Sequence, residues 1–130
     1  MSANLKTASF DASVLQYKIV SDILLNATPL IDVTQEAGSL YYLTVVNGTS
    51  GGTAQNYFAK FAFSTSEVVV GTTTPDFMVY LAANTTTKVA MPSGISFTSL
   101  SVWAVDSAAD AATTFTVGAS GAVKITMVAS

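Results

Sequence analysis

The sequence predicts an all-β protein, built as a two-sheet β-sandwich of jelly-roll or Greek-key type with about eight strands. Its apolar residues alternate with polar ones or form short continuous runs, and no segment keeps a helical apolar stripe. β-branched and aromatic residues dominate these runs. Gly, Asn, Pro and Ser mark turns roughly every 8–12 residues, which is the spacing typical of sandwiches.

The first half of the chain supplies four extended segments. Residues 14–20 and 22–26 predict one interrupted strand or two short ones, although residues 13–25 could alternatively form a short helix. Residues 29–33 form a short extended piece. Residues 39–47 are apolar on both faces, which is typical of a central strand of a sandwich.

The second half adds five segments. Residues 55–64 alternate, with most of their aromatic side chains on one side. Residues 76–82 and 87–91 are strands joined by an Asn-Thr-rich turn, and a Pro-Ser-Gly turn separates them from a strand over residues 95–105. Residues 122–129 alternate cleanly, so Val, Ile and Met are expected inside, and Lys and Thr outside.

The composition favours a protein that associates with other protein. The 130 residues fit one domain, with an N-terminal arm at residues 1–12 and a single β-sandwich at residues 13–130. Only 10% of the residues are charged, against roughly 25% in an average domain. Ser and Thr number 15 and 18. A surface of hydroxyls and small residues repels like molecules weakly, which suits packing against neighbouring subunits.

The same composition disfavours several function classes. The five cations are all Lys, and the chain has no Arg for bidentate phosphate or base contacts, so no nucleic acid is expected as a partner. Without His or Cys, the Ser–His and Cys nucleophiles and the usual zinc ligands are missing. No apolar run is long enough to span a bilayer, so no membrane partner is expected. We therefore expect no enzyme activity, no catalytic residue, no cofactor and no metal.

Three groups of residues are candidates for chemistry. Asp106 with Asp110, or Asp32 with Glu36, could form a glycosidase pair, and the first pair could offer oxygen ligands to calcium, but capping of turns is favoured. Lys60, Lys88 and Lys124 are expected to be surface cations at outward strand positions. Trp103 and the tyrosines could stack on sugars, although aromatic residues on strands are more often core.

Residues 38 to 129 resemble a pattern in small virion proteins of tailed bacteriophages, the capsid decoration (cement) proteins. The matching motifs are the runs Asn56-Tyr-Phe-Ala-Lys-Phe, Val70-Gly-Thr-Thr-Thr-Pro, Met91-Pro-Ser-Gly and Val123-Lys-Ile-Thr-Met-Val. Ser99-Leu100 stands where the family often has Gly, and the first 35 residues match little.

The resemblance implies a virion protein on the outer surface of the capsid, made in the host cytoplasm. It implies a homotrimer that binds the major capsid protein and braces neighbouring capsomers. We expect the interface to include Leu5 and Phe10 of the arm, together with Trp103. The alternatives are a carbohydrate- or receptor-binding module of a tail fibre, and a tail or baseplate structural protein.

Overall fold

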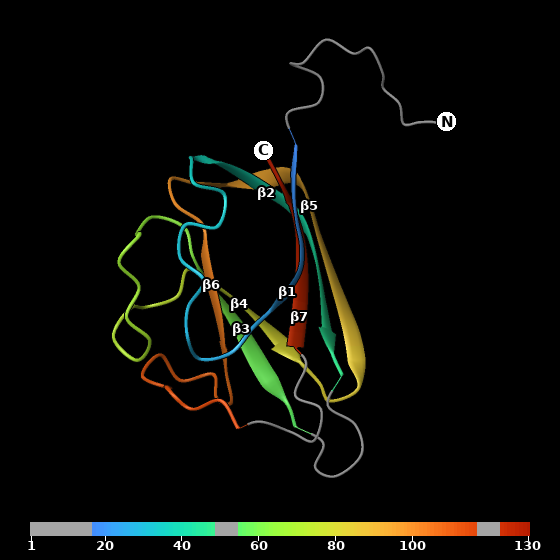
Figure 1. Ribbon diagram of the computed structural model, residues 1–130, viewed down its shortest axis with the longest axis vertical. Coiled ribbons are helices and arrows are strands. Elements are labelled where there is room, and N and C mark those ends of the chain that lie inside the picture. The colour runs from blue at the N-terminus through green and yellow to red at the C-terminus, as the bar shows by residue number, and fades with distance from the viewer. Residues whose placement is uncertain (1–16, 49–54, 117–122) are drawn as a thin grey trace.

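The computed structural model describes residues 17–48, 55–116 and 123–130, with Asp22 described by its backbone alone. These residues form two antiparallel sheets packed face to face (Figure 1). The strands are β1 (Lys18–Leu24), β2 (Gly38–Asn47), β3 (Tyr57–Ala62), β4 (Phe77–Leu81), β5 (Thr85–Phe97), β6 (Ser101–Val105) and β7 (Val123–Ala129). The all-β sandwich predicted from the sequence is confirmed.

The order of the strands defines the topology. Sheet A has the order β1-β7-β2-β5, and sheet B has the order β4-β3-β6. A further segment, residues 26–33, runs antiparallel beside β6. Leu30 and Val102 form a bridge, with the Leu30 N–H donating to the Val102 carbonyl at 2.8 Å. The Val33 N–H donates to the Leu100 carbonyl at 2.8 Å, which extends the pairing.

Counted with residues 26–33, the described chain has eight strand-like segments. We number these segments one to eight along the chain, so that residues 26–33 are the second. The order in sheet A is then 1-8-3-6, and the order in sheet B is 2-7-4-5. Every pairing is antiparallel. This arrangement is that of a jelly roll, in which two Greek keys are wound together.

The main core fills the space between the two sheets. Inward side chains of β7 (Val123, Ile125 and Met127) alternate with outward ones, as the sequence predicts. They meet Leu43 and Val45 of β2 and the aromatic side of β3. Because all these positions have no solvent exposure, the register of both sheets is fixed by burial of one face.

Two predicted boundaries differ from the structure. β5 continues through Pro92, which a strand tolerates at the edge of a sheet, where its missing N–H leaves no ladder bond unmade. Gly94, with φ +76°, forms the accompanying irregularity opposite the bulge near Tyr41. The predicted strand over residues 95–105 is instead divided, because the chain crosses from sheet A to sheet B at residues 98–100.

The alternative of a helix near residues 13–25 is wrong over its described part. Lys18–Leu24 is a strand paired with β7, and its register shifts between Val20 and Ile23. The interruption expected near residue 21 is therefore a β-bulge within one strand.

Candidate binding surface

The two outer faces of the sandwich differ in their exposure. Residues 63–76 and 106–116 cover the outer side of β3 and β6, away from sheet A (Figure 1), whereas Met78 and Tyr80 on the outer side of β4 stay exposed. Ala62, Val68, Trp103 and Val105 form a second buried cluster beneath these loops. The protein thus has a small additional core outside sheet B.

Trp103, predicted as an interface residue, belongs to this second core. Its side chain is 1% exposed and packs with Val68 and Val105. In the isolated chain it offers no ring to a sugar or to a flat partner. Leu5 and Phe10, the two other predicted interface residues, lie outside the described residues.

Lys60 is not the exposed cation that the alternation of β3 predicts. Its position on the outer face is as expected, but the side chain is fully buried beside Trp103 of β6. The Nζ donates to the Ala109 carbonyl at 2.6 Å. Burial lowers the pKa of the Lys60 amine from its ordinary value, and the negative charge of Asp110 opposes this shift.

Three carboxylates of the two candidate catalytic pairs have polar partners of their own. Asp106 accepts hydrogen bonds from the Thr116 N–H at 2.9 and 3.1 Å, which closes the loop over residues 106–116. Asp32 accepts one from the Ser99 hydroxyl at 3.3 Å, and Glu36 pairs with Lys18. Asp106 therefore joins the two ends of its loop, ten residues apart, rather than a local turn.

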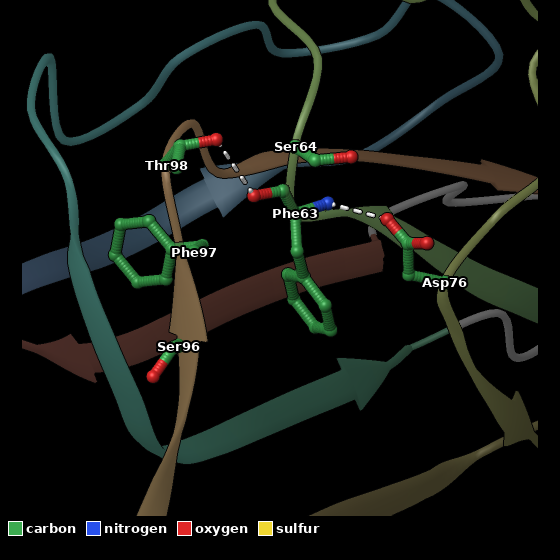
Figure 2. Close-up of a pocket in the computed structure, with 6 residues that line it drawn as sticks. All are labelled: Phe63, Ser64, Asp76, Ser96, Phe97 and Thr98. Atoms are coloured by element: carbon green, nitrogen blue, oxygen red, sulfur yellow. Dashed lines mark hydrogen bonds between the residues drawn. The ribbon is translucent and has the colours of Figure 1, made fainter.

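One pocket opens where the ends of β3 and β5 meet (Figure 2). Its volume is ≈ 330 Å³, and the rings of Phe63 and Phe97 make its lining mainly apolar. The single carboxylate there, Asp76, accepts a hydrogen bond from the Phe63 N–H at 2.7 Å. The pocket therefore holds no pair of carboxylates, and Asp76 is used to fix the backbone.

The outer face of sheet A presents a continuous four-stranded surface, which we call the open face. The registers place its outward side chains in three rows: Ile19, Val128, Tyr42 and Ala90; Thr126, Thr44 and Lys88; and Leu24, Lys124, Val46 and Thr86. All of these side chains are exposed or half-buried. No described segment covers this face.

The open face carries several exposed large apolar side chains, although Ile31, Val69, Met78 and Tyr80 are exposed elsewhere. Ile19 is 70% exposed, Leu24 57% and Val46 41%. Tyr17, 59% exposed, precedes β1 and meets Tyr41 edge to face, with ring centroids 5.4 Å apart. Exposed aliphatic and tyrosine side chains together on one face are typical of interaction surfaces.

The charges of the described side chains are segregated. Lys18 is paired with Glu36 and Lys60 is buried, whereas Lys88 and Lys124 project from the open face. The six described carboxylates all lie in the loops after β1, β3 and β6: Asp32, Glu36, Glu67, Asp76, Asp106 and Asp110. Among the described side chains, the open face thus carries two amines and no carboxylate, in a protein whose net charge is −3.

Alternation in the sequence predicts that the two lysines point outward, but it does not predict the open face as a whole. The signal was present in the alternation of residues 122–129, whose outward side carries Lys124 and Thr126. The missing information was strand order, because the rows join residues from four strands that are far apart in the chain.

Within the described part of the chain, no helix is long and apolar enough to cross a membrane. No group of three or more carboxylates is placed there to hold a metal ion. No family model, no curated protein and no solved structure matches the chain.

Proposed function

We propose that this protein is a structural component of a phage virion, a decoration protein that binds the outer surface of the head and braces neighbouring capsomers. It acts by binding alone. The observation that carries the proposal is the open face, a four-stranded surface of aliphatic, tyrosine and hydroxyl side chains that the described chain leaves uncovered.

Several features are consistent with this role. The jelly roll recurs among capsid and other virion proteins, as a fold-level analogy. The low charge content reduces repulsion between copies that stand close together on a lattice. A homotrimer on the major capsid protein would repeat each weak contact three times, and avidity would multiply them.

The proposal is tested by locating the protein in intact particles. Gold-labelled antibodies against the chain are applied to intact virions of the phage that encodes it, and the labels are counted by electron microscopy. Label distributed over the head supports the proposal. Label confined to the tail or baseplate contradicts it and favours a tail structural protein, and unlabelled virions contradict both.

One observation favours a receptor-binding module of a tail fibre as a second candidate. The exposed Tyr17 and the half-buried Tyr41 form an aromatic pair, Tyr42 is the next residue along β2, and tyrosine rings can stack on sugars. A glycan array distinguishes the two functions. A glycan that binds the native chain but does not bind the variant Tyr17→Ala supports the receptor-binding module. Absence of binding to any glycan counts against it.

A further inference from the structure

We infer that the open face docks on an apolar protein surface that carries carboxylates, with sheet B and its loops directed away from the partner. This inference rests on the proposed function, because it names the face that would lie against the head and the chemistry of the surface below it. It is carried by the segregation of charge between the two sides of the sandwich.

The charges on the open face indicate which charge the surface of the partner carries. Lys88 stands in the middle row of the open face and Lys124 in the adjacent row, on strands separated only by β2. Among the described side chains, no carboxylate projects from sheet A. A partner with carboxylates opposite these two amines gains attraction at contact, whereas a basic partner is repelled.

The same pattern disfavours a second copy as the occupant. Two open faces placed together would oppose lysines to lysines. The acidic loops of a second copy are complementary, but the loops after β3 and β6 lie on the opposite side of the sandwich (Figure 1). Contacts between opposite sides generate an open stack rather than a closed ring. The complementary surface therefore belongs to a different protein.

The size of the face sets the strength of the contact. Four strands about 4.8 Å apart and about seven residues long span roughly 20 by 23 Å, or about 450 Å². A stable one-to-one complex buries about 800 Å² on each partner. A single open face therefore binds weakly, and several faces in one oligomer are needed for lasting attachment.

The experiment separates the charge of the face from the charge of the molecule. Gold surfaces carry mixed monolayers of methyl and carboxylate groups, or of methyl and amine groups, and binding is followed by surface plasmon resonance. The net charge of −3 predicts a preference for amines, whereas docking through the open face predicts a preference for carboxylates at low salt.

A matched pair of variants completes the design. The double variant K88Q/K124Q removes the two amines, and T72E/T74E adds two negative charges on the exposed loop after β3, so both carry the same net charge. We expect K88Q/K124Q to lose about tenfold in affinity for the carboxylate monolayer, with T72E/T74E close to the native chain. Thermal unfolding verifies that each variant is folded.

The outcomes distinguish this inference from the proposed function. Preference of the native chain for amine monolayers, or equal loss in both variants, overturns the docking face even if virions are labelled on the head. Unlabelled heads together with the expected monolayer results overturn the decoration role and leave the docking face intact.

Discussion

At the scale of single residues, Lys60 shows that an outward strand position can still be interior. Its neighbours on β3 alternate as predicted, with Tyr57, Ala59 and Phe61 facing the main core. The side chain of Lys60 points the other way, but Ala109 and Trp103 enclose it. The cover comes from a loop 49 residues further along the chain, which local alternation cannot reveal.

This burial predicts a pH dependence of stability. Because the pKa of folded Lys60 is lower than that of the unfolded chain, the unfolded state binds more protons between those two values. The free energy of unfolding should therefore rise with pH between the pKa of the folded state and that of the unfolded state. At pH values below both, the cost of burying the charged amine is fully present. Denaturant unfolding at neutral and alkaline pH, followed by the fluorescence of Trp103, measures this rise.

The variant Lys60→Met isolates the contribution of the amine. It should lack the alkaline rise and, at neutral pH, be equal in stability or more stable by roughly 1 kcal/mol, because an apolar side chain replaces a buried charge. Lys88→Met, at an exposed position, should keep the rise of the native chain. Parallel pH profiles for the native chain and Lys60→Met would show that Lys60 is not the group responsible.

Asn47 is a second residue whose side chain is predicted to matter for stability. It is 1% exposed, and its Nδ2 donates to the Gln55 carbonyl at 2.8 Å and to the buried Leu81 carbonyl at 3.1 Å. Asn47→Ala leaves these acceptors without that donor, so the free energy of unfolding should fall by about 1–3 kcal/mol.

A matched amide provides the control for Asn47. Asn56 is exposed, and its Oδ1 accepts a hydrogen bond from the Ala83 N–H at 2.9 Å. Because water can replace that bond, Asn56→Ala should cost no more than about 1 kcal/mol in urea unfolding. Equal losses in the two variants would mean that burial of the amide is not the decisive factor.

At the scale of elements, Gly94 is required by the irregularity of β5. Its φ is +76°, and a Cβ there would lie 2.8 Å from Cε1 of Tyr41 and 3.0 Å from Cβ of Ser39. Gly94→Ala should therefore lower the free energy of unfolding by about 1–2 kcal/mol and move the Tyr41 ring. Ser93→Ala is the control, because Ser93 is exposed next to it. Tolerance of alanine at residue 94 in thermal unfolding would argue against this backbone geometry.

At this scale, the position of some strands and the direction of their side chains could be predicted from the sequence alone. The strand predicted over residues 39–47 is β2, and the predicted inward residues of β7 are buried. Their alternation is local, so it can be seen without knowing the neighbours. The continuity of β5 through Pro92 could not be predicted, because it depends on β5 having a partner on one side only.

The binding surface was predictable only in part for the same reason. The outward direction of Lys88 and Lys124 follows from alternation within one strand, whereas their position on one face follows from β2 lying between β5 and β7. Trp103 was placed on a strand correctly, but its burial depends on loops that pack against sheet B. Contacts made by loops carry no periodic signal in the sequence.

At the scale of the whole molecule, the sandwich has two unlike sides. The outer side of sheet A is the open face, whereas loops that carry carboxylates cover β3 and β6 of sheet B. A decoration protein with this polarity would attach by sheet A and expose acidic loops to solvent. Such an arrangement would keep decorated heads apart through like charges on their outer surface.

The sixteen residues before Tyr17 lead to the edge strand of the open face, and they underlie the last prediction. Fully extended, sixteen residues reach about 55 Å. A sandwich of about 114 residues has a radius of gyration of only about 13 Å, so this length suffices to reach a neighbouring subunit. Residues 1–10 include Leu5 and Phe10, two of the predicted interface residues.

Deletion of residues 1–10 should therefore weaken the proposed trimer and leave the sandwich folded, because the described cores contain none of these residues. Light scattering after size-exclusion chromatography, over a dilution series, should give trimers for the native chain and smaller species for the shortened one. The double variant L5S/F10S, which keeps the full length, should dissociate in the same way if apolar contacts of the arm hold the oligomer. Trimers that resist both changes would assign the contact between subunits to the sandwich itself.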